Sequence, residues 1–209
     1  EKTVSVVDLA SFTEEGKIEV APNLHRLRAD RHGRLWATSR GDYWTEPSRL
    51  FRLTLDAAGT SASVDTLDIP VSDLCIVGDS LYYIGVDLEQ QDGHGIVDVA
   101  RAEPLASWLT SAPEFSEITL PYGIIVNPED RDFYVMDAKD YLSSGQLYHF
   151  RADGTFEWRV WTGDNPVMLH LYISENQHGR PAAIVNIDCS LDLAMQALPD
   201  SELQYGLFC

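Results

Sequence analysis

The sequence predicts an all-β protein assembled from repeated antiparallel units of four short strands. The main observation is a stretch of roughly 45 residues that recurs along the chain. One copy runs from Tyr122 to Gly163 and another from His25 to Pro70. Each holds four runs in which apolar and polar residues alternate, separated by Gly, Asp and Pro turns. Such a unit is typical of one blade of a β-propeller, a scaffold that by itself names no function.

The predicted strands follow one another from the first residues onward. A first pair, joined by a polar loop, covers Val4–Leu9 and Lys17–Val20. The unit that ends at Pro70 reads LHRLRAD, RLWATSR, RLFRLTL and SVDTLDI. The next unit reads DLCIVG, SLYYIGV, GIVDVAR and FSEITL, and the last reads YGIIVN, DFYVMDA, QLYHFRA and FEWRVWT. Short connections such as HG, GD, NPED and ADG fit tight hairpins between these strands.

Only two short segments favour a helix. EPLASWL, from Glu103 to Leu109, interrupts the third unit, and SLDLAMQAL has Ser190 as its N-cap and Pro199 as its terminator. No linker or low-complexity stretch divides the chain. We therefore expect one propeller domain over residues 1–188 and a C-terminal tail over residues 189–209, for which a short helix is one option.

The two ends of the chain leave the number of blades open. The first two strands resemble the last half of a blade, and VMLHLYI (Val167–Ile173) with AAIVNI (Ala182–Ile187) resembles the first half. If the two halves pair, the ring closes with four blades. If they do not, the chain is a section of a larger propeller with open blade edges.

Composition narrows the classes of partner. The apolar fraction of 44% and aromatic fraction of 10% are those of a folded protein, and 15 Lys and Arg against 33 Asp and Glu give a net charge of −18. Nucleic-acid binding needs a basic patch, and the sequence contains no Lys/Arg cluster, so we expect no nucleic-acid partner. No apolar run reaches the ~20 residues that span a bilayer, so we predict no transmembrane segment.

Cysteine, histidine and nucleotide motifs give no cofactor or metal prediction. Cys75, Cys189 and Cys209 form no CxxC pair, and Cys75 lies in an apolar run that favours a core position. The histidines show no zinc spacing: we expect His94 in a turn and His149 beside the core. No GxSxG, GxGxxG or P-loop occurs. We therefore predict no catalytic residues, no cofactor and no metal.

Two similar blocks, RGDYW and DAKDY, form the best candidate ligand site. Each follows the second strand of its unit, so in a propeller both would emerge on one face. Aromatic rings cover apolar sugar or peptide surfaces, while acids and bases fix orientation. The alternative is that the Asp and Tyr side chains lock the turns through hydrogen bonds. The candidate residues are Arg40, Asp42, Tyr43, Trp44, Asp137, Lys139, Asp140 and Tyr141.

The amino-acid sequences of the repeats resemble those of a known family. Six segments carry the resemblance: PYGIIVNPEDRDFYVMDAKDYLSSGQLYHF followed by TGDNPVMLHL, and VSVVDLASF, LRADRHGRLWATSRGDYW, PSRLFRL and DTLDIPVSDLCIVGDSLYYIG. They are similar to the YVTN/YncE-like, surface-layer-type propellers of Gram-negative gut bacteria. The resemblance covers roughly Val4–Tyr172, with DAKDY its most specific part. It implies a propeller, usually of seven blades, exported to the periplasm or outer cell surface, often as a lipoprotein anchored through a segment outside this chain.

The chain departs from that family at both ends, which limits what the resemblance implies. Family members carry further blades ahead of the position of Val4 and end near Leu169–Tyr172, whereas this chain continues to Cys209. The family offers no catalytic residues to carry over. It implies a non-enzymatic, extracytoplasmic propeller that binds a glycan, peptide or protein partner across one face. The alternatives are a structural surface-layer component that self-associates through open blade edges, and a propeller-type lactonase or lyase.

Overall fold

The structure, a computed structural model, has an all-β fold and confirms that part of the prediction. It describes residues 2–42, 44–86, 92–106, 109–164, 166–175 and 181–189. All the strand pairs in this part of the chain are antiparallel. The strands are β1 (Thr3–Val7), β2 (Glu14–Glu19), β3 (Leu24–Ala29), β4 (Leu35–Ser39), β5 (Arg49–Leu55), β6 (Ala62–Leu67), β7 (Asp73–Val77), β8 (Ser80–Val86), β9 (Asp92–Asp98), β10 (Glu103–Ala106), β11 (Pro121–Val126), β12 (Phe133–Asp137), β13 (Ser144–Phe150), β14 (Phe156–Asp164), β15 (Pro166–Glu175) and β16 (Pro181–Cys189).

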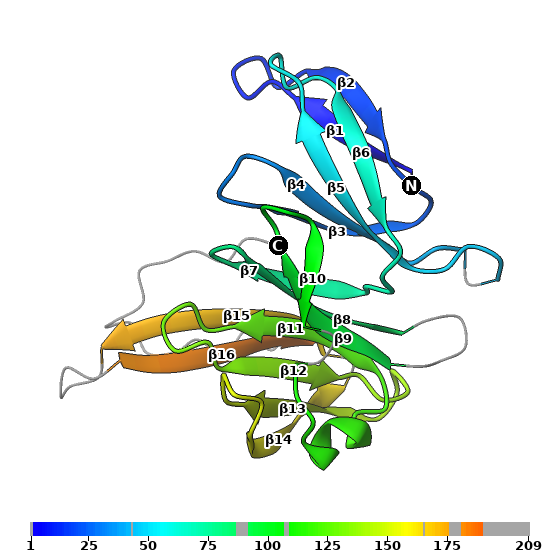
Figure 1. The fold of residues 1–209 in the computed structure, drawn as a ribbon. Helices are drawn as coiled ribbons and strands as arrows, with labels where there is room; N and C mark the ends of the chain where they lie inside the picture. The colour runs from blue at the N-terminus through cyan, green and yellow to red at the C-terminus, as the bar shows by residue number, and fades with distance from the viewer. Residues whose placement is uncertain are drawn as a thin grey trace.

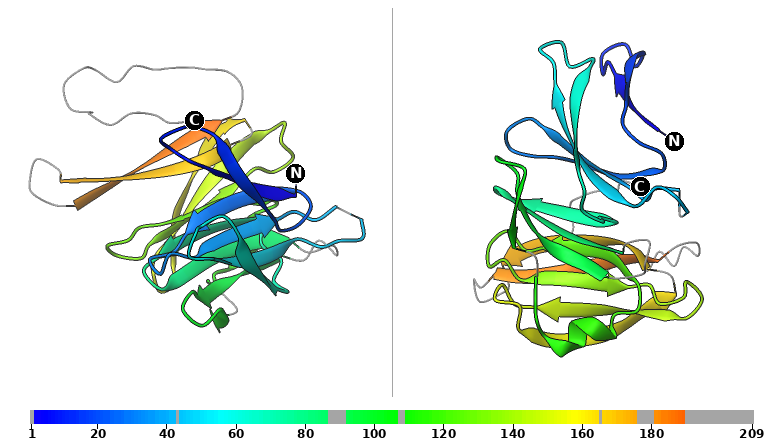
Figure 2. Two further views of the ribbon diagram at one scale, coloured as in Figure 1. Left: turned by 90° about the horizontal axis from the view of Figure 1, so that it is seen from above. Right: turned by 45° about the vertical axis from the view of Figure 1, so that its right-hand side comes forward.

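The strands form sheets in which sequence neighbours are also spatial neighbours. Three sheets have four strands each, β3 to β6, β7 to β10 and β11 to β14, and two have two strands, β1 with β2 and β15 with β16. Figure 1 shows the β3–β6, β7–β10 and β11–β14 sheets following one another down the molecule, with the β15–β16 pair beside β11, and Figure 2 shows the molecule from two other directions. The first strands of consecutive sheets adjoin, β3 beside β7, β7 beside β11 and β11 beside β15.

One buried carboxylate ties three of these first strands together. Arg26 Nε on β3 donates a hydrogen bond to Asp73 Oδ1 on β7 at 2.9 Å. The backbone N–H of Ile124 on β11 donates to Asp73 Oδ2 at 3.0 Å. Burial raises the pKa of Asp73, against the opposing charge of Arg26. Both carboxylate oxygens therefore have partners, which is what a buried acid requires.

The cores lie between consecutive sheets, because alternate residues of a strand point to opposite faces. Trp36 and Leu50 enter the core shared with the β7–β10 sheet. Ala37 and Phe51, one residue further along the same strands, enter the core beneath the β1–β2 hairpin. A fully buried Leu such as Leu50 contributes about 2 kcal/mol to folding. Sheets covered on both faces explain why the strands carry so many apolar residues.

Two predictions between residues 100 and 120 are wrong. The segment predicted as a helix, EPLASWL, begins instead with the strand β10. Asp98 causes this, because its side chain accepts a hydrogen bond from the N–H of Arg101 at 3.0 Å and its carbonyl accepts one from Ala102 at 2.8 Å. Ala102 takes a positive φ of 58°, and the chain reverses so that Glu103 pairs with Asp98.

The segment predicted as the fourth strand of that unit, FSEITL, overlaps a short 3-10 helix. This helix, η1 (Pro113–Glu117), has Pro113 at its start, where a missing N–H is tolerated. Phe115 and Ile118 are both buried in the core against the β11–β14 sheet. Residues three apart share a side of a 3-10 turn, so this apolar spacing fits the turn as well as it fits a strand.

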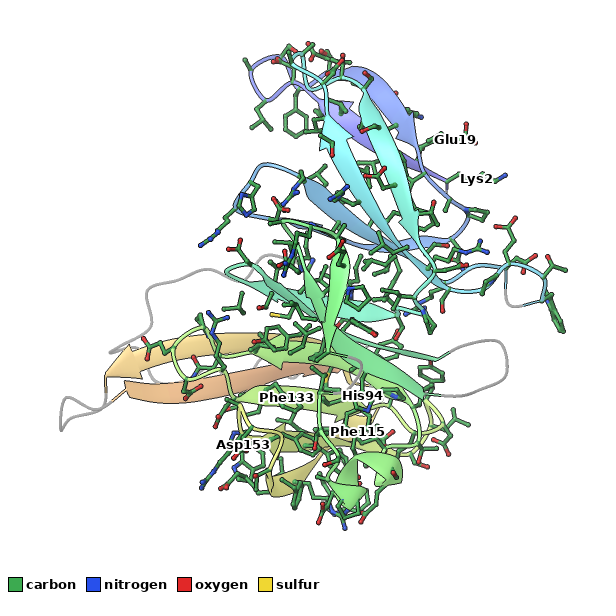
Figure 3. The ribbon with its side chains drawn as sticks, in the orientation of Figure 1. Lys2, Glu19, His94, Phe115, Phe133 and Asp153 are labelled. Atoms are coloured by element: carbon green, nitrogen blue, oxygen red, sulfur yellow. The ribbon has the colours of Figure 1, made fainter. Side chains whose placement is uncertain are left out.

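The prediction of a turn at His94 is also wrong, because His94 lies within β9 and is buried. Its Nδ1 accepts a hydrogen bond from the backbone N–H of Leu109 at 2.8 Å, and its ring centroid lies 4.1 Å from that of Phe115. Figure 3 shows His94 close to Phe115, and Phe133 lies in the same hydrophobic core as Phe115. Burial lowers the pKa of His94 to about 4, so its imidazole is neutral near pH 7.

The two ends of the chain do not complete a common sheet. The β1–β2 and β15–β16 pairs are separate two-stranded sheets, and they lie apart in Figure 1. The four-bladed ring that the sequence left open is therefore not formed. The predicted tail helix, SLDLAMQAL before Pro199, lies outside the described residues, as does Cys209. Cys75 packs against the core as predicted, and burial raises the pKa of its thiol.

Within the described part of the chain, no helix has the length and hydropathy needed to cross a membrane.

Candidate functional site

The two loops that the sequence singled out emerge on the same side of the molecule. Residues 40–48 follow β4, and residues 138–143 follow β12. Both loops lie on the right-hand side of Figure 1. Each connects the second strand of its sheet to the third, so the repeat of the fold places them in equivalent positions.

The loops are built alike, starting from Ser39 at the end of β4 and Asp137 at the end of β12. The N–H of Gly41 donates to Ser39 Oγ at 3.0 Å, and the N–H of Lys139 donates to Asp137 Oδ1 at 2.9 Å. Gly41 and Lys139 therefore hold the same position, and both have a positive φ, 65° and 51°. A residue with a side chain is uncommon in this region of φ, and Lys139 is such a residue.

The next position in each loop is an aspartate that organises the backbone after it. Asp42 accepts hydrogen bonds from three following backbone N–H groups at 2.7 to 2.9 Å and from Thr45 Oγ1 at 2.5 Å. Asp140 accepts from two backbone N–H groups at 2.7 and 3.0 Å and from Ser143 Oγ at 2.9 Å. These bonds hold the pKa of both carboxyls below the ordinary value.

Asp137 forms the buried floor of the second loop. Its side chain is 0% exposed, and Oδ1 accepts from the N–H groups of Leu120 and Lys139, both at 2.9 Å. Its other oxygen, Oδ2, is buried and has no hydrogen-bond partner in the described part of the chain. A buried carboxylate oxygen without a partner is costly, whereas the two bonds to Oδ1 hold the turn.

Tyr122, at the start of β11, joins the two loops. Arg40 Nη2 from the first loop donates to the Tyr122 hydroxyl at 3.3 Å, and its guanidinium carbon lies 5.4 Å from the centroid of that ring. From the second loop, the ring of Tyr141 meets Tyr122 edge to face, with centroids 5.5 Å apart. Loops separated by almost a hundred residues thus form one surface, which we call the loop surface: Arg40, Tyr122, Lys139, Tyr141 and Trp161.

His25 supports Arg40 from β3. Arg40 Nη2 lies 2.8 Å from His25 Nε2. Burial, reinforced by the charge of Arg40, lowers the pKa of His25 to about 4. The imidazole is therefore neutral near pH 7 and accepts the hydrogen bond from the guanidinium. This contact fixes the direction in which Arg40 reaches Tyr122.

Lys139 extends the loop surface toward β14. Its ammonium nitrogen lies 4.9 Å from the centroid of the Trp161 ring, within the range of a cation–π contact. Trp161 is 68% exposed and Tyr141 is 45% exposed. Both rings therefore offer apolar faces to solvent. Lys139 lies next to Trp161, and a second cation, Arg40, contacts Tyr122, the ring that Tyr141 meets.

The remaining predicted residues contribute differently. Trp44 is exposed, and Tyr43 lies outside the described residues. Asp42, Asp137 and Asp140 accept hydrogen bonds from their own loops, which is the turn-locking role that the sequence left as the alternative. The side chains available to contact a ligand are accordingly the basic residues and the aromatic rings of the loop surface.

Sequence reasoning missed Tyr122, Trp161 and His25. Tyr122 lies within a strand, where an aromatic residue is ordinary. A regular hairpin register counted from the NPED turn sets Tyr122 opposite Asp137, which would have placed Tyr122 beside the second loop. In the structure a register shift between Pro121 and Gly123 pairs Pro121 with Asp137 instead. Trp161 lies in the same cross-strand row as Asp137, but two strands away, and that relation needs two hairpin registers.

Two small cavities lie along the first strands rather than at the loop surface. One of about 210 Å³ is lined by residues of β1, β3 and β4, including His25 and Arg26. The other, of about 100 Å³, lies beside the Arg26–Asp73 pair and Cys75. Pockets that enclose small molecules measure roughly 300–1,000 Å³, so neither cavity is large enough for one. No group of three or more His, Cys, Asp or Glu suited to a metal lies among the described residues.

Comparisons with known proteins bear on the fold alone. No family model matches the chain, and no curated protein matches it. Among solved structures, the chain is similar to hydrazine synthase of Kuenenia stuttgartiensis at 14% identity and a TM-score of 0.57, over 96% of this chain and 53% of that one. It is also similar to a chain in the structure of S. cerevisiae Dbp5 bound to Nup159, Gle1, IP6 and ADP, at 12% identity and a TM-score of 0.51, over 91% of this chain and 56% of that one.

These likenesses show that the stack of antiparallel sheets recurs in other solved proteins. The chain spans about half the length of each of the two chains it matches. At such low identity a shared fold carries no activity, ligand or partner with it.

Proposed function

We propose that the chain is a section of a β-propeller that binds an extended ligand, a glycan or a peptide, across the loop surface without transforming it. The propeller part of the proposal is supported by consecutive four-stranded antiparallel sheets whose first strands adjoin. It is supported also by the resemblance of the repeats to YncE-like propellers.

The single observation that carries the binding proposal is that Arg40 and Tyr141, one from each loop, both contact Tyr122. Two equivalent loops could have stayed independent, each satisfied by its own aspartate. Instead they are joined by a ring and a guanidinium that neither loop needs for its own turn. A joined surface with exposed rings and fixed donors suits a ligand that lies across both loops.

The chemistry of the loop surface favours sugars or peptide groups. Tyr141 and Trp161 present exposed aromatic faces, which cover the apolar C–H faces of pyranose rings or peptide side chains. Arg40 and Lys139 donate hydrogen bonds to hydroxyl, carbonyl or carboxylate oxygens. The surface is open rather than enclosed, which supports binding of a chain-like ligand over catalysis in a water-excluded pocket.

The location of the protein and the other functions considered stay as predictions. An exported protein at the periplasm or outer cell surface follows from the family resemblance alone. The lactonase or lyase alternative requires an acid or metal in reacting position, and the acids of the loops are engaged with their own backbone.

A thermal-shift screen with neutral and charged oligosaccharides and extended peptides tests the proposal. A ligand of the folded state stabilises it by about 2.7 kcal/mol at a hundredfold excess over Kd, and this raises Tm by a few degrees. We expect Tyr141→Ala to abolish the shift. Phe12→Ala, which removes an exposed ring from the β1–β2 turn, should keep it. A shift that survives Tyr141→Ala, or no shift with any member of the panel, would overturn the proposal.

A further inference from the structure

The outer edges of the three four-stranded sheets differ in how well they are protected from pairing. The edge strand β10 is only four residues long and contains Pro104, and β6 carries Asp65 and other polar side chains. The edge strand β14 is nine residues long, and its described residues include no proline. It exposes Trp158, Val160 and Trp161 to solvent. Short length, proline and charge are the usual protections of an edge, and β14 lacks most of them.

The outer side of β14 offers backbone groups for a further strand. It pairs with β13 on one side, and no described strand pairs with it on the other. Alternate residues of such a strand direct their N–H and C=O groups away from the sheet. The strand also forms the lower margin of the stack in Figure 1. An edge of this kind accepts an added antiparallel strand.

We propose that β14 pairs antiparallel with β14 of a second copy of this chain, about a two-fold axis that passes through Val160. This interface includes Trp161 at the margin of the loop surface, but the argument for it does not depend on the proposed ligand-binding function. A two-fold arrangement uses the same strand twice, as closed dimers do, and it leaves neither β14 edge free for further growth.

The register follows from two irregularities in the β13–β14 ladder. Register shifts fall between His149 and Phe150 and between Ser144 and Gln146, so the regular run of β14 is Trp158–Trp161. Bulges pin register, because a slip of one residue would turn every side chain to the other face. Residues directly opposite each other must share a face, so the two-fold axis passes through a residue and not between two.

The side chains within the regular run then select the residue on the axis. An axis through Arg159 would place the two guanidinium groups directly opposite each other, which is unfavourable. An axis through Val160 places Val160 opposite its copy and Arg159 opposite Trp161 of the other chain, twice. Aliphatic pairs and Arg–Trp pairs are both favourable across strands. The strand is thus complementary to itself in the register centred on Val160.

Sedimentation velocity over a series of protein concentrations tests this interface with a matched pair of variants. Val160 is 47% exposed, so Val160→Lys should fold normally while placing two ammonium groups on the axis. We expect the full chain to dimerise reversibly and Val160→Lys to weaken dimerisation about tenfold or more. Leu105→Lys adds the same charge to the exposed edge strand β10 and should leave dimerisation unchanged. A chain that stays monomeric, or an equal effect of both variants, would overturn the proposal.

A cross-link at the axis tests the register itself. Opposed residues in antiparallel strands have Cα atoms about 4.5–5.5 Å apart, within reach of a disulfide. Oxidation of Val160→Cys should give dimers in which peptide mass spectrometry finds position 160 joined to position 160. Glu157→Cys lies in the irregular part of the strand and should not cross-link to its own copy. Cross-linking of Glu157→Cys with none at position 160 would refute an axis through Val160.

Discussion

The loops after β4 and β12 share one frame and differ in what they display. Both begin with a side chain that accepts a hydrogen bond from the N–H two residues on, and both continue with an aspartate that caps the turn. At the position with positive φ, the first loop has Gly41 and the second has Lys139. A second left-handed residue, Tyr141, follows in the second loop. The second loop thus accepts strain that glycine would have avoided, and both strained residues contact aromatic rings of the loop surface.

The floor of the two loops differs as well. Ser39 donates its hydroxyl to the carbonyl of Pro22, whereas Asp137 in the equivalent position accepts from the N–H of Leu120. A small neutral group closes the first loop, and a buried acid with an unpartnered oxygen closes the second. The first loop thus closes without a buried acid and with glycine at its left-handed position. The second loop closes with a buried acid and places two strained side chains against the rings of the loop surface.

The largest effect should come from giving the first loop a side chain at its left-handed position. A Cβ at Gly41 would run into the backbone carbonyl of Glu46. We expect Gly41→Ala to lower the free energy of unfolding by about 3 kcal/mol, measured by urea denaturation. Gly33→Ala is the control, because Gly33 also has a positive φ but nothing lies within 4 Å of the added Cβ. It should cost about 1 kcal/mol, and equal costs would refute the steric account.

Two replacements of the buried Asp137 distinguish the contributions of its two carboxylate oxygens to stability. Asp137→Ala leaves the N–H groups of Leu120 and Lys139 without an acceptor and should destabilise the protein by about 2–3 kcal/mol. Asp137→Asn keeps the accepting oxygen and should cost under about 1 kcal/mol, since the oxygen that it replaces has no partner. Chemical denaturation of the two variants measures the difference. If Asn proves as costly as Ala, Oδ2 has a partner that matters to folding.

A smaller effect should follow from relieving strain in the second loop. Lys139→Ala and Lys139→Gly both remove the ammonium group from Trp161, so their difference reports the backbone alone. Because Lys139 has φ 51°, we expect the Gly variant to be more stable than the Ala variant by about 1 kcal/mol. Both should bind ligand more weakly than the original protein. An Ala variant as stable as the Gly variant would show that the loop relaxes without cost.

The smallest effect concerns pH. Hydrogen bonds from Thr45 and from the following backbone lower the pKa of Asp42 below its ordinary value of 3.8. A group with a depressed pKa in the folded state contributes stability that is present above its unfolded pKa and is lost as the pH falls below it. Asp42→Asn should therefore lose less stability than the original protein as the pH falls below 3.8. Parallel acid titrations of unfolding, with Asp140→Asn alongside, measure this; identical profiles would contradict the capping role.

Much of the fold could be predicted because its strands carry a local signal. Alternation of apolar and polar residues located β3 to β6 and β11 to β14, and glycines such as Gly33, Gly78 and Gly154 have the positive φ that tight turns need. The pattern failed between residues 100 and 120. There the short edge strand β10 contains Pro104, which is uncommon in a strand. The apolar spacing of Phe115 and Ile118 fits both a strand and a 3-10 turn.

The candidate site could be predicted as two loops but not as one surface. The motifs RGDYW and DAKDY can be recognised in the sequence, and their equivalent positions follow from the repeat. The residue that joins them, Tyr122, lies 82 positions from Arg40, and its role arises from packing between sheets. The sequence leaves the acids either as ligand acceptors or as residues that lock the turns, because it does not reveal hydrogen bonds within a turn. The sequence alone therefore predicts neither the long-range packing that joins the loops nor the local backbone geometry within them.

The measurement that tests the central claim most directly is an amide chemical-shift map by NMR, recorded while the panel of oligosaccharides and peptides is titrated into the protein. The claim is that both loops form one binding surface through Tyr122. It predicts that a bound ligand shifts amides of residues 40–42 and 139–142 together, at one concentration midpoint. Shifts confined to one loop, shifts centred elsewhere such as the β1–β2 hairpin, or no shift with any ligand in the panel would contradict it.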